Sequence, residues 1–357
     1  MRLSRPVALL AGLSTLLALP AALAAERIQV VTSFSILADM IENVGGEHVE
    51  VTALVGPDSD AHVYSPRPTD ARALAEADLV VFNGLKFEGW MERLIDASDF
   101  AGPLVVATDG IAGRIAAAED DGHDDHDDDA HDHGHEAHGD EGNEAHDGHD
   151  HGPIDPHAWQ DLGMGPLYVD NILAGLIEAD PDNGDAYRAS AERYLEAIAA
   201  ADGELRERLG EIPAGTSVIT GHDSFGHFAR AYGLQFLSPQ GLSTEAEPSA
   251  ANMARLIDVI REKNVRALFH ENMTSPAMID QLAEETALPV AGTLYADALA
   301  SDGEASSWLG MMRHNARTLH DALAEPGQGE DDHSDDDHAG DGHEYDNGAH
   351  DDHGHEH

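Results

Sequence analysis

Short apolar runs alternate with amphipathic stretches along most of this chain. Residues 27–33 (R-I-Q-V-V-T-S) form a β-branched run typical of a strand, and residues 34–44 carry apolar side chains at helical spacing. The further predicted strands lie at 49–55, 79–82, 104–107, 217–220, 234–237, 267–269 and 290–294. The further predicted helices lie at 69–77 (with Thr69 as N-cap), 167–177, 225–232, 249–260, 276–286 and 308–323. Strands that alternate with helices over short connections predict doubly wound α/β lobes.

One predicted helix is much longer than the others. Residues 183–209 contain no proline and place apolar side chains on one side and many charged ones on the other. At about 1.5 Å per residue this helix is roughly 40 Å long, enough to run along two lobes and join them. We therefore predict an N-terminal α/β lobe at 26–182, a single long rigid helix at 183–211 and a C-terminal α/β lobe at 212–324.

The first 25 residues have the pattern of a secretory signal. Arg2 and Arg5 precede an apolar run at 7–19, and small residues at 21–25 provide a cleavage site. The apolar run is too short for a transmembrane anchor, which needs about 20 residues. The chain has no cysteine, so it offers neither disulfides, thiolate metal ligands nor a lipidation site. We expect a signal peptide at 1–25 and a soluble periplasmic protein without a lipid anchor.

The charge of the chain is strongly negative and unevenly spread. Asp and Glu number 69 against 19 Lys and Arg, a formal net charge of -50. Such a surface disfavours nucleic acid as a partner and favours cations. Two tracts combine acidic residues with histidine: 119–151 has nine histidines, and the tail at 325–357 has seven. Both lack the apolar residues needed for a core, so we expect disordered segments that bind metal weakly, or else solvated acidic linkers.

Four residues outside the tracts share a position where an element ends and a loop begins. They are His62, His157, His222 and Asp297. Each lobe supplies two of them, at strand ends where open α/β sheets bind ligands. Three imidazoles and one carboxylate suit a divalent transition metal in a roughly tetrahedral site, and the nitrogen donors favour Zn²⁺ over Mn²⁺. The sequence therefore predicts one metal site in the cleft between the lobes.

The same donor set argues against an enzyme. Four protein ligands leave no open position for a reactive water. A zinc hydrolase would also need a general base, for which Glu271 is the only obvious candidate. We interpret Glu271 instead as an acceptor that orients an imidazole from outside the ligand shell, and we expect neighbouring His270 to face the cleft. Other candidates are interpreted as packing, capping or surface positions: His48, His227, Glu245, Glu247, His314 and His320.

Four motifs, in this order, resemble one known family. They are D-A-H-V-Y-S-P-R-P-T-D, D-P-H-A-W, G-H-D-S-F-G-H-F-A-R-A-Y-G-L and L-Y-A-D-A-L, within residues 28–323. The chain resembles the metal-specific substrate-binding proteins of bacterial ABC transporters, in the zinc/manganese group, and most of all the periplasmic zinc-binding kind. The resemblance implies two α/β lobes bridged by one long helix, with a buried metal between them.

The resemblance also implies a function. It assigns the ligand role to His62, His157, His222 and Asp297, whereas manganese-binding members carry a glutamate where His222 stands. It implies delivery of Zn²⁺ to a membrane permease driven by a cytoplasmic ATPase. We expect a monomer that captures Zn²⁺ with high affinity in the periplasm; a loading zinc chaperone is left open. The alternatives are a metal buffer or adhesin, which the two tracts alone would support, and a Mn²⁺-importing binding protein.

Overall fold

The computed structural model describes residues 27–113, 154–246, 248–263 and 265–324. The predicted signal peptide and both His-rich tracts lie outside these residues. The described chain forms two four-stranded parallel sheets with the orders β2-β1-β3-β4 and β6-β5-β7-β8. We call the first sheet with its helices the N-terminal lobe and the second the C-terminal lobe. Two parallel α/β lobes confirm the predicted fold class.

The strands of both sheets are short, and the two central strands of each sheet are mostly buried. The first sheet contains β1 (Ile28–Phe34), β2 (Val49–Val55), β3 (Leu79–Phe82) and β4 (Leu104–Val106). The second contains β5 (Ser217–Ile219), β6 (Gln235–Leu237), β7 (Ala267–Glu271) and β8 (Val290–Leu294). Runs such as L-V-V-F are apolar throughout because helices cover both faces of a parallel sheet. The repeated strand order places β1 and β5 at equivalent positions, each between two neighbouring strands.

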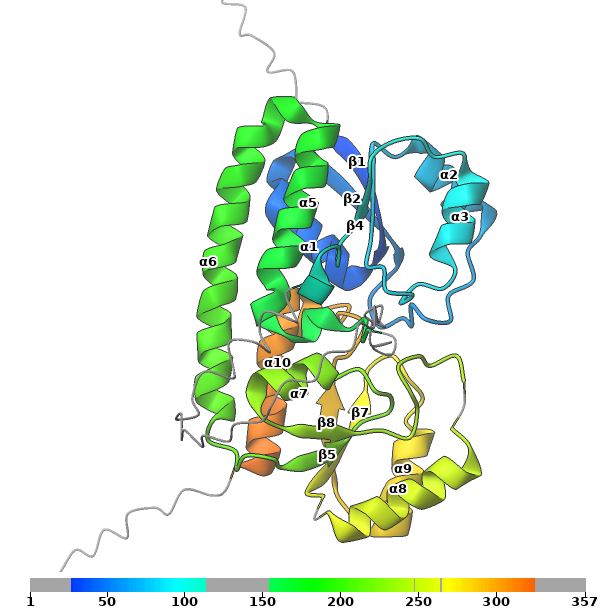
Figure 1. The fold of residues 1–357 in the computed structure, drawn as a ribbon, viewed down its shortest axis with the longest axis vertical. Coiled ribbons are helices and arrows are strands. Elements are labelled where there is room, and N and C mark those ends of the chain that lie inside the picture. Colours follow the sequence, from blue (N-terminus) through cyan, green and yellow to red (C-terminus); the bar gives the residue numbers. More distant parts are fainter. Residues whose placement is uncertain (1–26, 114–153, 247, 264, 325–357) are drawn as a thin grey trace, which may run out of the picture. The chain divides into compact units, whose positions relative to one another are not determined.

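Helices flank each sheet on two sides (Figure 1). In the N-terminal lobe they are α1 (Ser35–Gly45), α2 (Pro68–Glu76), α3 (Met91–Ser98) and α5 (Gly165–Ala179). In the C-terminal lobe they are α7 (Gly226–Tyr232), α8 (Ala250–Glu262), α9 (Ala277–Thr286) and α10 (Trp308–Leu323). Helix α2 begins earlier than predicted, with Arg67 and not Thr69 at the N-cap. Proline at the first helical position and the Asp70 carboxylate, which accepts the Arg67 N–H at 2.6 Å, fix this start.

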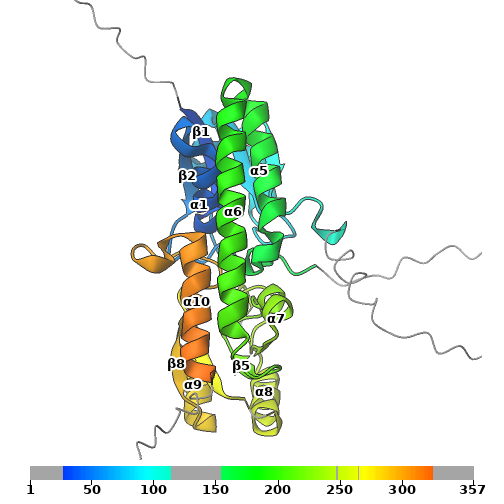
Figure 2. The same cartoon turned by 90° about the vertical axis from the view of Figure 1, so that its left-hand side faces the viewer.

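The long helix α6 (Gly184–Leu209) runs past both lobes (Figure 2). One side of it is buried along its whole length, from Tyr187 through Ile198 to Leu209. It packs against α1 and α5 of the N-terminal lobe and against α10, and α10 in turn contacts α1. The lobes are therefore joined by a helix with a continuous apolar side and by a second helix packed beside it.

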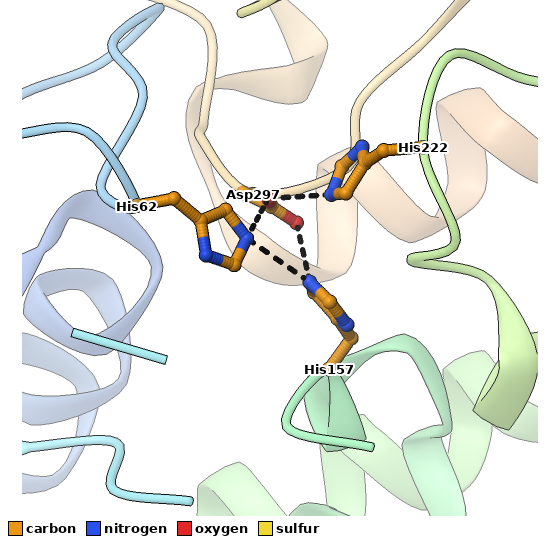
Figure 3. Close-up of side chains that lie close together, drawn as sticks. All are labelled: His62, His157, His222 and Asp297. Atoms are coloured by element: carbon orange, nitrogen blue, oxygen red, sulfur yellow. Dashed lines mark hydrogen bonds and ion pairs between the residues drawn. The ribbon is translucent and has the colours of Figure 1, made fainter. Parts of the chain in front are cut away.

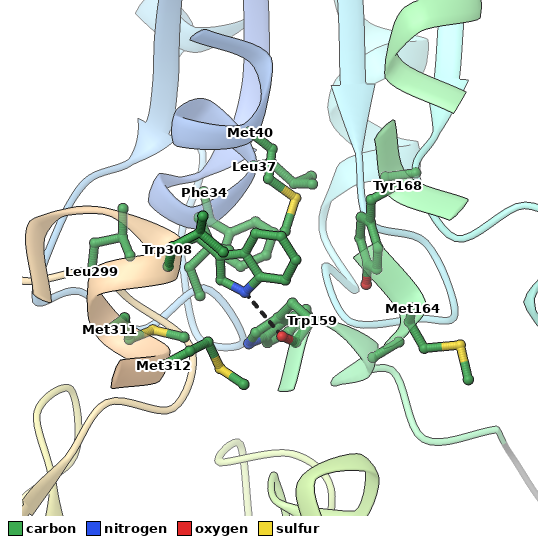
Figure 4. Close-up of a cluster of buried hydrophobic side chains, with 14 of the residues drawn as sticks. Phe34, Leu37, Met40, Trp159, Met164, Tyr168, Leu299, Trp308, Met311 and Met312 are labelled. Atoms are coloured by element: carbon green, nitrogen blue, oxygen red, sulfur yellow. Dashed lines mark hydrogen bonds between the residues drawn. The ribbon is translucent and has the colours of Figure 1, made fainter. Parts of the chain in front are cut away.

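A single hydrophobic core crosses from one lobe to the other. Trp159 and Trp308 are fully buried at its centre, and the Trp308 indole N–H donates to the Trp159 carbonyl at 2.9 Å (Figure 4). Phe34 packs on Trp159 with ring centroids 4.9 Å apart. A smaller cluster, which includes Leu268 and Leu282, lies apart in the C-terminal lobe. Within the described residues no helix is both long enough and apolar enough to cross a membrane.

Candidate metal centre

The structure brings all four predicted residues together between the lobes (Figure 3). His62, His157, His222 and Asp297 each offer a ligand atom, and these atoms lie within 4.8 Å of one another. The Asp297 carboxylate is central: its Oδ2 lies 3.0 Å from His222 Nε2 and 3.2 Å from His62 Nε2, and its Oδ1 lies 3.7 Å from His157 Nε2. All four side chains are buried. Three Nε2 atoms and two carboxylate oxygens thus enclose one small volume.

Several of these atoms lack a hydrogen-bond partner among the described residues. They are His222 Nε2 and both carboxylate oxygens of Asp297, and each is shielded from solvent. Although His222 Nε2 and Asp297 Oδ2 are close, their geometry is not that of a hydrogen bond. Buried polar atoms are normally satisfied, so an unsatisfied group at one point indicates a missing partner. A divalent cation bound by these atoms would supply that partner.

Loops after strands position three of the four residues. His222 and Asp297 each stand three positions beyond a strand, β5 and β8, and His62 lies in the loop between β2 and α2. His157 is different, since a short 3₁₀ turn (Ala158–Gln160) follows it and strand β4 ends far upstream at Val106. The expectation that every member of the set follows a strand was therefore wrong for His157.

The segment after His157 is attached to the C-terminal lobe. The Trp159 indole N–H and the Gln160 side-chain amide both donate to the carbonyl of Ala296, at 2.9 and 2.7 Å. Ala296 directly precedes Asp297, so these hydrogen bonds tie two of the four residues to each other. The N-terminal lobe contributes the Asn83 side-chain amide, which donates to the Pro156 carbonyl at 3.0 Å. The turn that carries His157 is therefore bonded to both lobes.

Carboxylates orient two of the imidazoles. His157 Nδ1 lies 2.7 Å from Asp155 Oδ1, and His222 Nδ1 lies 2.7 Å from Glu271 Oε2. An Nδ1–H that donates to a carboxylate leaves the Nε2 lone pair facing inward, the tautomer that binds metal. Glu271 Oε1 also accepts the backbone N–H groups of Gly221 and His222, at 2.9 and 3.1 Å. The structure thus gives Glu271 the orienting contact expected of it, and Asp155 makes the same contact unpredicted.

The charges of the site are strongly coupled. Burial alone would lower the pKa of His222, but the Glu271 and Asp297 carboxylates outweigh it and raise that pKa well above its usual value. Burial alone would raise the pKa of Asp297, yet the imidazoles of His222 and His157 hold it well below its usual value. The carboxylate of Asp297 is therefore kept ionised although it is fully buried. An ionised carboxylate surrounded by imidazoles attracts a cation.

An aromatic wall and a strained turn support His62. The Phe87 ring packs edge-on against His62, with centroids 4.6 Å apart. The preceding Leu85 and Lys86 have left-handed backbones, with φ of 55° and 65°. Buried Glu88 holds this turn, because its carboxylate accepts the N–H of Asn83 at 2.7 Å and others nearby. No sequence pattern singled out Glu88.

The remaining histidines are engaged elsewhere. His227 is buried, as a packing role predicts; its Nε2–H donates to the Asp155 carbonyl at 3.0 Å, and its Nδ1 accepts from Arg230 at 2.7 Å. His270 pairs with Asp280 of α9 at 2.9 Å and is not among the four, contrary to the expectation that it faces the cleft. The three histidines predicted to lie at the surface are partly exposed, namely His48, His314 and His320. Glu245 is exposed, and Glu247 lies outside the described residues.

Comparison with known proteins gives a family match over most of the chain. The family model described as ZnuA, zinc-uptake complex component A, periplasmic, matches residues 30–322. The manganese-binding lipoprotein MntA of Bacillus subtilis is 29% identical over 305 residues, covering 84% of this chain and 90% of that protein. The iron-binding protein YfeA of Yersinia pestis is 28% identical over 297 residues, covering 83% of this chain and 86% of that protein.

Solved structures show the same fold. The periplasmic zinc-binding protein TroA from Treponema pallidum superposes with a TM-score of 0.71 at 24% identity, covering 84% of this chain and all (100%) of that one. A manganese-bound periplasmic metal-binding protein from Candidatus Liberibacter asiaticus gives a TM-score of 0.65 at 26% identity, covering 83% of this chain and 99% of that one. The names of these similar proteins refer to zinc, manganese and iron.

Proposed function

This chain belongs to the ZnuA family, the metal-binding substrate-binding proteins of ABC transporters, and from that premise we propose that it captures Zn²⁺ for import. Proteins of this kind bind and carry a substrate and are not enzymes; they work with a membrane permease and an ATPase. We assign this chain to the periplasm, where it takes up Zn²⁺ with high affinity and delivers it to the permease. The metal is cargo, held by His62, His157, His222 and Asp297.

The donor set is the observation that supports zinc. Three imidazole nitrogens and one carboxylate converge within 4.8 Å, and both oxygens of Asp297 and Nε2 of His222 lack partners among the described residues. Tetrahedral sites with nitrogen and oxygen donors are typical of Zn²⁺, whereas Mn²⁺ favours more oxygen ligands. Hydrogen bonds from His157 and His222 to carboxylates preset the ring orientation that such a site needs.

Manganese import is the second candidate. The relative from Bacillus subtilis is named for manganese binding, and a manganese-bound structure shares the fold. These names belong to proteins less than 30% identical to this chain. The nitrogen-rich donor set outweighs them in our proposal.

A competitive titration tests both candidates. The full chain would be titrated with Zn²⁺ and with Mn²⁺ against a chromophoric chelator strong enough to mask weak sites. We expect one tight Zn²⁺ per chain, lost or greatly weakened in His222→Ala and unaffected in the matched control His270→Ala, whose side chain pairs with Asp280. Mn²⁺ that displaces Zn²⁺ from the tight site would favour manganese import, and absence of any tight site would contradict both.

Further parts of the proposal concern residues that the structure does not describe. We assign weak additional Zn²⁺ binding to the tracts at 119–151 and 325–357, from their alternating histidine and carboxylate residues. We assign a monomer, exported by a signal peptide at 1–25 and without a lipid anchor since no cysteine is present. A zinc chaperone would be a further partner, to be sought by capture of the metal-free protein from periplasmic extract.

A further inference from the structure

The three imidazoles differ in what holds their outer nitrogen. Nδ1 of His157 and of His222 each meets a carboxylate at 2.7 Å. Among the described residues none forms a hydrogen bond to Nδ1 of His62. The His62 ring is held instead by packing on Phe87, and its backbone N–H donates to Asp60. The position of His62 therefore depends on whatever fixes the loop between β2 and α2.

The carboxylate of Asp60 connects that loop to the opposite lobe. Asp60 Oδ1 accepts the backbone N–H of His62 at 2.9 Å. Asp60 Oδ2 accepts the hydroxyl of Thr244 at 2.6 Å, and Thr244 lies in the C-terminal lobe beyond β6. The two oxygens of Asp60 thus join the proposed ligand His62 to Thr244, which lies 184 positions after Asp60 in the sequence.

Asp58 anchors the start of the same loop to the same lobe. Its N–H donates to the Leu299 carbonyl at 2.9 Å, and its carboxylate accepts from the Ser301 N–H at 3.1 Å and from the Asn272 amide at 3.2 Å. Its backbone is left-handed, with φ of 51°, a conformation uncommon outside glycine, although Asp adopts it more often than most residues. A strained backbone persists where several contacts hold it, so this loop is fastened and not merely adjacent.

We propose that Asp60 is a positioning residue that makes the position of His62 depend on contact between the lobes. The hydrogen bond between Asp60 and Thr244 then sets how fast the site releases metal. This inference rests on the proposed function. When the loop leaves the C-terminal lobe, His62 leaves with it. His157, His222 and Asp297 stay together, because Trp159 and Gln160 remain bonded to the carbonyl before Asp297. Release then begins with the loss of one defined ligand.

The test is the rate of metal release from the full chain loaded with Zn²⁺. Excess chelator is added in a stopped-flow instrument, and the slow phase reports the tight site. Thr244→Val keeps the shape of the side chain and removes the hydroxyl, so we expect release about tenfold faster from the loss of one charge-assisted hydrogen bond. Asp60→Ala also loses the bond to His62 and should release faster still, whereas Asp60→Asn keeps an acceptor for the His62 N–H and should fall between it and wild type.

Two controls separate positioning from a general loss of structure. Thr216→Val removes a hydroxyl that donates to the Pro213 carbonyl at 2.6 Å within the C-terminal lobe, and should release metal at the wild-type rate. In a His62→Ala background Thr244→Val should have no further effect, because it acts only through His62. A wild-type release rate in Thr244→Val, or an equal acceleration in the His62→Ala background, would overturn the inference. A wild-type chain with no tight site would overturn the proposed function, and this inference with it.

Discussion

The two lobes have the same strand order and yet contribute unequally to the site. The C-terminal lobe carries His222 and Asp297 and binds the turn of His157 through two hydrogen bonds to Ala296. The N-terminal lobe contributes His62 from a loop, and its hydrogen bond to the His157 turn comes from Asn83. A repeated topology therefore does not imply a site divided equally between its halves. Three of the four proposed ligands form one preassembled group, and the fourth closes it.

The largest expected effect compares Asp297, one of the three preassembled ligands, with His62, the ligand that closes the site. Asp297 is the one charged donor of the four, fully buried, and its two oxygens lie within 3.7 Å of all three Nε2 atoms. Asp297→Ala should weaken Zn²⁺ binding by about 3–5 kcal/mol, the usual cost of removing one partner from a buried charged group. His62→Ala should cost less, about 1–3 kcal/mol, because the other three donors stay in place. Both affinities are measured by competitive titration.

The prediction is tested by which of the two substitutions weakens Zn²⁺ binding more. If His62→Ala weakened binding as much as Asp297→Ala, the site would not be a preassembled group of three closed by a fourth. Circular dichroism of the metal-free variants provides the control for folding.

The next effect concerns the carboxylates outside the ligand shell. Glu271→Gln should weaken Zn²⁺ binding roughly 10- to 100-fold, the range measured when the acceptor behind a metal-binding histidine is changed. Asp155→Asn should be milder, because its side chain is 22% exposed, whereas that of Glu271 is fully buried and also holds two backbone N–H groups. The same titration measures both. Equal affinity in Glu271→Gln and wild type would show that the orientation of His222 does not depend on this carboxylate.

The sequence and the structure agree where short patterns decide the outcome. The alternation of apolar runs and amphipathic stretches predicts both sheets, since strand and helix periods are local properties. Three histidines and an aspartate that lie outside the predicted strands and helices were predicted to meet, and the structure brings them together. Glu271 was anticipated because it lies two positions after a buried run at 267–269.

What the sequence could not predict depends on contacts between distant segments. The attachment of His157 to the C-terminal lobe comes from two side-chain donors that reach a backbone carbonyl 136 and 137 positions away, and no periodicity encodes such a contact. The sequence also does not predict that Glu88 is buried, because a lone glutamate ahead of a helix is usually exposed to solvent. The start of α2 at Pro68 was missed since proline at the first helical position competes with threonine as a signal.

A third prediction concerns a contact between the lobes that lies away from the four residues. Asp39 of α1 accepts the backbone N–H of Trp308, the first residue of α10, at 2.9 Å. Burial raises the pKa of Asp39 to about 6, although this hydrogen bond lowers it. The folded state therefore binds the proton more tightly than the unfolded state, whose pKa is near 3.8. The stability contributed by this proton is complete below about pH 4 and is lost as the pH rises through about 6.

Asp39→Asn removes this titration while keeping an acceptor for the Trp308 N–H. In metal-free protein the free energy of unfolding of the variant, relative to wild type, should rise by up to about 2 kcal/mol between pH 4 and pH 7. Urea unfolding at several pH values measures it. A difference that stays constant with pH would show that the carboxyl at this joint between α1 and α10 does not titrate in that window.

The smallest expected effect tests whether the N-terminal lobe contributes anything beyond His62. Residues 119–151 fall within that lobe in the sequence and contain nine histidines. Replacing them by a short Gly-Ser linker should change the affinity of the tight site by less than about twofold, because all four proposed ligands and the carboxylates behind two of them lie elsewhere. The total amount of Zn²⁺ bound per chain should fall as the weak sites are lost.

Metal counting alongside competitive titration separates the affinity of the tight site from the total amount of Zn²⁺ bound, and removal of 325–357 provides the matched comparison. Loss of the tight site in the first variant would give the tract a direct role in binding, and the metal-buffer interpretation would then replace the import one.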